Sequence, residues 1–164
     1  QRIPDLVNYL AATALRLRVL HLHGYMFPAN FEKLAGLEEL EAIHLPYAIP
    51  LDAPTVSCLA GMPRLKAITL RACRVDVPNV RNLEFLNASC THLTALNLAH
   101  LGARCPELRV LDLCYAPLLD RTVLPTLAGF RHPLEMLGLG GFDLTDEDLE
   151  LIVRTWGGLR NLGI

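Results

Sequence analysis

The 164-residue chain has no long apolar run and no marked excess of either charge. Its apolar stretches are short and are interrupted by arginine, histidine or glutamate, so we expect no membrane-spanning helix. Its 15 basic and 17 acidic residues give a formal net charge of -2, which provides no general attraction to nucleic acid or to an anionic membrane surface. Charged residues make up 20% and apolar residues 52% of the chain, which favours a buried core over disorder.

The cysteines lack the spacing and the even number of a disulfide or zinc framework. There are five of them, at Cys58, Cys73, Cys90, Cys105 and Cys114, and no two form a CxxC pair. The pattern favours free, mostly buried thiols in a reducing compartment. We therefore expect an intracellular protein of the cytoplasm or nucleus, with an organelle as the alternative.

Sequence signatures of catalysis are also missing. Ser57, Ser89, His100 and Asp112 are residue types found in hydrolase triads, but neither a nucleophile elbow nor an oxyanion loop accompanies them. The glycines within 138–141 lack the full GxGxxG pattern of a dinucleotide site. We expect no enzyme activity and no cofactor.

What the chain does contain is a repeated phrase of leucine, two residues, leucine, one residue, leucine, with isoleucine in some copies. The copies begin at Leu17, Leu40, Leu65, Leu93, Leu108, Leu134 and Leu159. Each alternates its side chains as a short strand does, with the leucines on one face. Repetition at this period is typical of a solenoid, an architecture that usually binds and rarely catalyses.

Segments with helical spacing lie between the copies of the phrase. We expect helices over 4–14, 30–35, 53–60, 121–128 and 146–154. Thr145 is a good N-cap for the last of these, with Asp148 three residues further on. Three helices end on Leu-Ala-Gly, and we expect Gly36, Gly61 and Gly129 to adopt the left-handed conformation of a helix C-terminus. The repeating unit is strand, turn, helix, turn.

One interval in the array is too short. The steps between phrase starts are 23, 25, 28, 15, 26 and 25 residues, and the 15-residue step from Leu93 to Leu108 cannot hold both a strand and a normal helix. We favour a strand at Leu93, because Cys90-Thr-His-Leu93 resembles the lead-in Cys105-Pro-Glu-Leu108. The alternatives are a strand over 80–85 with a helix over 93–104, or a missing loop near His100.

The detailed motifs resemble the cysteine-containing leucine-rich repeat, a ribonuclease-inhibitor-like type found C-terminal to F-boxes. They are Leu70-Arg-Ala-Cys73, Cys105-Pro-Glu-Leu-Arg-Val-Leu-Asp-Leu113 and Leu144-Thr-Asp146. The resemblance covers nearly the whole chain and implies an α/β solenoid of about seven strands, with a curved parallel sheet on the concave face and helices on the convex face. The sequence departs from the pattern where Ala48, Ala116 and Phe142 replace the strand-end cysteine.

Strand alternation directs the residues between the leucines away from the core. One outward column is small and apolar, from Val19 to Met136, and charged residues flank it, which suits a protein-binding face. The same residues also suit strands that meet no partner. The residues expected on the binding face are Val19, His21, His23, Ala42, His44, Ala67, Thr69, Arg71, Ala95, Asn97, Val110, Asp112 and Met136.

Histidines and aromatic residues add three further candidates. His21 and His23 share a strand face near His44, but third and fourth metal ligands are hard to find, so we expect polar surface histidines and no metal site. Trp156 is expected to cover the last apolar layer, with a partner anchor as the alternative. A further set of aromatic residues past the strand ends either packs in the loops or extends the binding face: Tyr25, Tyr47, Tyr115 and Phe142.

The sequence therefore predicts one leucine-rich-repeat array over 1–164 that acts as a protein-interaction module. Because the chain begins at Gln1 and stops within a repeat at Ile164, we expect a fragment of a longer solenoid. Its partners should be proteins, with neither nucleic acid nor membrane insertion. The alternatives are the substrate-recognition part of an F-box ubiquitin-ligase adaptor and an accessory subunit of a large assembly.

Overall fold

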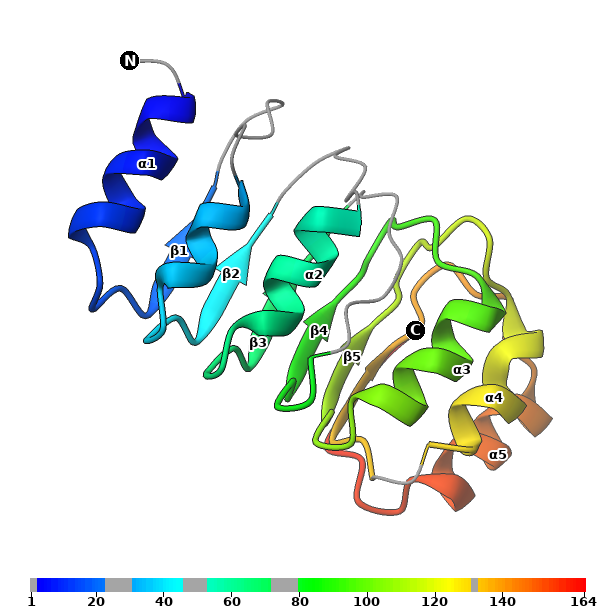
Figure 1. Cartoon of the computed structure of the whole chain (residues 1–164). Helices are drawn as coiled ribbons and strands as arrows, with labels where there is room; N and C mark the ends of the chain where they lie inside the picture. The colour runs from blue at the N-terminus through cyan, green and yellow to red at the C-terminus, as the bar shows by residue number, and fades with distance from the viewer. Residues whose placement is uncertain (1–2, 23–30, 46–52, 72–79, 131–132) are drawn as a thin grey trace.

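Seven short strands form a single parallel sheet, covered on one side by helices (Figure 1). The computed structural model describes residues 3–22, 31–45, 53–71, 80–130 and 133–164. The strands are β1 Val19–His21, β2 Ala42–His44, β3 Ala67–Thr69, β4 Phe85–Asn87, β5 Val110–Asp112, β6 Met136–Gly138 and β7 Asn161–Gly163. They pair in chain order from β1 to β7, so the predicted α/β solenoid of about seven strands is confirmed.

The five predicted helical segments are helical in the structure, and one further helix, α3 Ala95–Arg104, lies where a strand was favoured. They are α1 Ile3–Thr13, the 3-10 helix η1 Phe31–Gly36, α2 Ala53–Gly61, α3 Ala95–Arg104, the 3-10 helix η2 Arg121–Val123, α4 Leu124–Ala128 and α5 Asp146–Thr155. None of the described helices is both long and apolar enough to cross a membrane.

The core lies between the sheet and the helices and is built from the repeated leucines. The central residue of each strand points into it, and Ile43, Ile68 and Leu111 have no exposed surface. Burial of each such side chain contributes about 2 kcal/mol before conformational entropy is counted. Trp156, at the end of α5, is only 3% exposed and packs in the same core, as expected of a residue that covers the last apolar layer.

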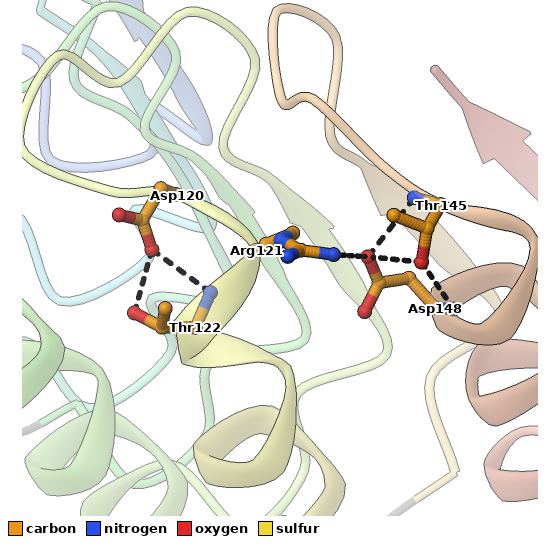
Figure 2. A network of polar contacts seen from close by, with 5 residues as sticks. All are labelled: Asp120, Arg121, Thr122, Thr145 and Asp148. Atoms are coloured by element: carbon orange, nitrogen blue, oxygen red, sulfur yellow. Dashed lines mark hydrogen bonds and ion pairs between the residues drawn. The ribbon is translucent and has the colours of Figure 1, made fainter.

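The first turn of α5 has the predicted cap and is linked to the preceding repeat (Figure 2). The Asp148 N–H donates to Thr145 Oγ1, and the Thr145 N–H and hydroxyl donate to Asp148 Oδ2. Arg121 Nη1 lies 3.3 Å from the same carboxylate oxygen. Hydrogen bonds from Thr145, and then the Arg121 charge, hold the pKa of Asp148 below its ordinary value of 3.8.

The predicted strand at Leu93 is wrong. Residues 95–104 form α3, because Thr94 and Asn97 make a reciprocal capping box at its start. The strand of this repeat is β4, which lies between β3 and β5 in the sheet. The alternative with a helix over 93–104 is closer, although its strand over 80–85 ends where β4 begins. The short interval lies between β3 and β4, whose first residues are Ala67 and Phe85.

The predicted left-handed glycines at the helix ends are also wrong. Gly129 has φ -76° and ψ -4°, and neither Gly36 nor Gly61 has a positive φ. These helices end in tight right-handed turns, in which an N–H reaches back three residues, as from Leu37 to the Leu34 carbonyl. Among the described residues, left-handed backbone occurs in turns that follow strands, at Cys90, Tyr115 and Gly141, with φ of 58°, 57° and 84°.

Candidate functional site

The face of the sheet opposite the helices presents the first and third residues of each strand. The first residues form one column in continuous register, and we name its apolar members the apolar column: Val19, Ala42, Ala67, Phe85, Val110 and Met136. Val19 is 47% exposed and the others are half-buried. The apolar surface therefore crosses six neighbouring strands without interruption.

Most of the residues predicted for this face lie on it. The structure brings together Val19, His21, Ala42, His44, Ala67, Thr69, Val110, Asp112 and Met136 as outward strand residues. Arg71 is exposed just beyond β3, and His23 lies outside the described residues.

Ala95 and Asn97 are not on the sheet. Ala95 is the first residue of α3, and the Asn97 side chain accepts the Thr94 N–H at 2.8 Å. The sheet positions predicted for Ala95 and Asn97 are occupied by Phe85 and Asn87 of β4. The spacing of Leu83 and Leu86, which repeats the first two leucines of the phrase, was the available signal for this strand.

The second outward column contains a histidine pair at its start. The rings of His21 and His44 stack with centroids 4.1 Å apart and planes 8° apart. Parallel imidazole planes do not direct two ring nitrogens at one point, as a shared metal ion requires. Within the described ranges no three histidine, cysteine, aspartate or glutamate residues are grouped as metal ligands.

Further along, the same column carries a hydrogen-bonded pair of polar side chains. Asn87 Nδ2 donates to Asp112 Oδ2 at 3.0 Å, across the boundary between β4 and β5. The backbone N–H and hydroxyl of Ser89 donate to Asn87 Oδ1 at 3.1 and 2.8 Å. The Cys114 N–H donates to Asp112 Oδ1 at 3.0 Å. Both side chains are therefore held in place by neutral donors.

Three of the described cysteines, Cys58, Cys105 and Cys114, have raised thiol pKa values, as unreactive thiols do. Cys58, Cys90, Cys105 and Cys114 are all free. Burial raises the pKa of Cys58 and Cys105 to about 11. Burial, followed by a hydrogen bond to Asp112, also raises the pKa of Cys114, which keeps this sheet-face thiol protonated at neutral pH.

A row of alternating charges borders the apolar column on its other side. We name it the charged rim: Arg18, Glu41, Lys66, Glu84, Arg109, Glu135 and Arg160. Its ion pairs are Arg18–Glu41 at 3.8 Å, Lys66–Glu84 at 2.8 Å, Arg109–Glu135 at 3.0 Å and Arg160–Glu135 at 3.5 Å. Such exposed pairs add little stability. As a result of these pairs, each acidic side chain of the charged rim lies next to a basic side chain from a neighbouring repeat.

The aromatic residues past the strand ends differ in exposure. Tyr115 is 69% exposed in a left-handed turn, and Phe142 is half-buried against the core. Tyr25 and Tyr47 lie outside the described residues.

Comparison with known proteins adds support for the fold. No family model and no curated protein sequence matches the chain. Among solved structures, an internalin from Listeria monocytogenes matches with a TM-score of 0.65 and 16% identity, over 100% of this chain and 51% of the internalin chain. The tropomodulin C-terminal domain of Caenorhabditis elegans matches with a TM-score of 0.50 and 15% identity, over 96% of this chain and 93% of that domain. The chain thus spans about half of the internalin, and the fold is that of a leucine-rich-repeat solenoid.

Proposed function

We propose that this chain is a non-enzymatic module that binds a protein partner through the exposed face of its sheet. The observation that carries the proposal is the uninterrupted apolar column. Phe85 and Met136 are larger than an exposed strand position requires. A partly exposed large apolar side chain removes more apolar surface from water on binding than a valine does, so these two residues favour a binding role for the column.

The electrostatics of the face support the same proposal. The acids of the charged rim are paired within the chain, so a partner need not neutralise a strong field to approach. An apolar centre with a polar border is the usual arrangement of a protein interface. Because the side chains stand on a hydrogen-bonded sheet, little conformational entropy is lost when a partner docks.

The cysteine chemistry supports a reducing compartment as the place of action. The four described cysteines are free although two of them, Cys90 and Cys114, lie in neighbouring turns. We propose an intracellular location and membership of the cysteine-containing repeat type, whose motif residue Cys105 is buried at the end of α3.

Charge placed on the apolar column tests the proposal. In the full chain, the double substitution Ala67→Glu/Val110→Glu should lower recovery of co-purified partners about tenfold or more, because carboxylates would be buried against apolar partner surface. The matched control is Ala99→Glu/Val153→Glu, at exposed helical positions. Quantitative mass spectrometry measures recovery, and thermal unfolding checks that both variants are folded.

Undiminished recovery with the sheet variant, or equal loss with the helical control, would contradict the proposal. The identity of the recovered proteins separates two alternatives within it. An F-box-binding adaptor indicates a ubiquitin-ligase component, and a fixed set of subunits indicates an accessory role in an assembly.

A further inference from the structure

Asp112 differs from the other acidic residues along the sheet. Glu41, Glu84 and Glu135 each have a basic partner on a neighbouring strand. Asp112 forms no ion pair within the part of the chain that the structure describes. It is a half-buried strand residue in the middle of the exposed sheet face. A cation brought by a partner would supply the opposite charge that the described part of the chain does not place beside Asp112.

The carboxylate of Asp112 is already held in one orientation. Oδ2 accepts from Asn87 Nδ2, and Oδ1 accepts from the Cys114 N–H, both at 3.0 Å. These donors are neutral, so they fix the position of the carboxylate without cancelling its charge. The Cys114 thiol also forms a hydrogen bond with this carboxylate. A carboxylate has about four acceptor sites, so capacity for a further hydrogen bond remains. A fixed acceptor loses little entropy when a cation binds.

The two strands beyond Asp112 carry no side chains in its column. Gly138 and Gly163 stand in register with it, and we name this pair the glycine floor. A Cβ on Gly138 would lie 2.6 Å from Asp112 Oδ1, so a larger residue would displace the carboxylate. Beside the glycine floor stand Met136 and Asn161 of the neighbouring column. Gly138 is buried, and the Cys114 sulfur would lie 3.0 Å from the same Cβ, so the open part of the glycine floor is Gly163. The apolar column runs along the edge of this floor.

We propose that Asp112 and the glycine floor bind an arginine side chain of the partner, while apolar partner residues next to that arginine contact Val110 and Met136. This inference rests on the proposed function and specifies the partner as a segment with an arginine flanked by apolar residues. Charge complementarity selects a cation, and the planar guanidinium presents paired donors that suit a fixed carboxylate better than an ammonium does.

Two peptides test this directly with the full, isotopically labelled chain. One is the capped tripeptide Leu-Arg-Leu, and the other replaces arginine with citrulline, which has nearly the same shape without the charge. Titration with Leu-Arg-Leu should shift the backbone amide resonances of Gly138 and Gly163. Citrulline should weaken the binding about fivefold or more, the usual effect of losing one charged contact.

Protein variants supply the matched control. Asp112→Asn should weaken binding of Leu-Arg-Leu about fivefold and leave binding of the citrulline peptide unchanged. Glu84→Gln makes the same chemical change at a rim acid that is already paired with Lys66, and should leave both affinities unchanged. The comparison with the citrulline peptide uses the wild-type chain. It therefore tests the arginine assignment even if Asp112→Asn perturbs the sheet.

Each outcome has a distinct meaning. Equal affinity of the two peptides on the wild-type chain, or no effect of Asp112→Asn, overturns the arginine assignment. If both peptides shift the resonances of Val110 and Met136 equally, the sheet face still binds peptide and the proposed function stands. If neither peptide shifts any sheet-face resonance, the arginine assignment fails, and the substitutions in the apolar column then decide on the proposed function.

Discussion

Two helix caps in this chain share one geometry and differ in chemistry. Thr94 caps α3 together with Asn97, and Thr145 caps α5 together with Asp148. In both, the threonine hydroxyl accepts the N–H three residues on, and the side chain there accepts the threonine N–H. Only the second box contains a titratable group, so only its strength should depend on pH.

At neutral pH, Thr94→Ala and Thr145→Ala should each lower the free energy of unfolding by about 1 kcal/mol. In the folded state the pKa of Asp148 lies below its ordinary value of 3.8. The ionised carboxylate therefore stabilises the fold above pH 3.8, and this contribution is lost as pH falls through the folded-state pKa. The cost of Thr145→Ala should therefore shrink as pH falls from neutral to below 3.8, while that of Thr94→Ala stays constant. Urea unfolding across this range measures both, and parallel pH profiles would contradict the account.

Single residues were predictable from sequence where the chemistry is local. The Thr145 cap needs only a residue three positions away, and the burial of Trp156 follows from its place in the repeat. The bond between Asn87 and Asp112 joins residues on different strands, so it could be found only once the register of β4 was known. The prediction of left-handed glycines at the helix ends was wrong because a tight turn can end a helix without left-handed backbone.

The elements most in doubt were β4 and α3, since leucine spacing fits both readings of that segment. Leu93, Leu96 and Leu98 match the strand phrase, but in the structure Leu98 is fully buried and Leu96 is 65% exposed. The true strand was hidden because Ala88 replaces the last leucine of its phrase. The capping box at Thr94 was present in the sequence, yet asparagine in place of the usual glutamate makes it a weak signal.

A pair of substitutions separates the two readings of this segment. Leu98→Ala should lower the free energy of unfolding by about 2–5 kcal/mol, because it leaves a cavity in the core. Leu96→Ala should change it by about 0.5 kcal/mol or less, because that side chain lies on the surface of α3. Urea unfolding at neutral pH gives both values. A large loss with Leu96→Ala would mean that residue 96 is a core strand position after all.

At the scale of the whole molecule, the array and its seven strands followed from the period of the leucine phrase. The long-range arrangement across strands did not. The charged rim alternates along the entire sheet, but Glu84 enters that alternation only when β4 is placed correctly. The misplaced strand thus put Ala95 and Asn97 in the columns where Phe85 and Asn87 lie, and it left Glu84 out of the charged rim.

The central claim is that partners dock on the sheet face in the register that the structure gives. Site-specific photo-crosslinking in cells tests it most directly, with a photoreactive phenylalanine analogue placed in turn at Phe85 on β4 and at Ala99 on α3. The account predicts covalent partner adducts from position 85 and none from position 99. Adducts from position 99 alone would contradict it and move the interface to the helices.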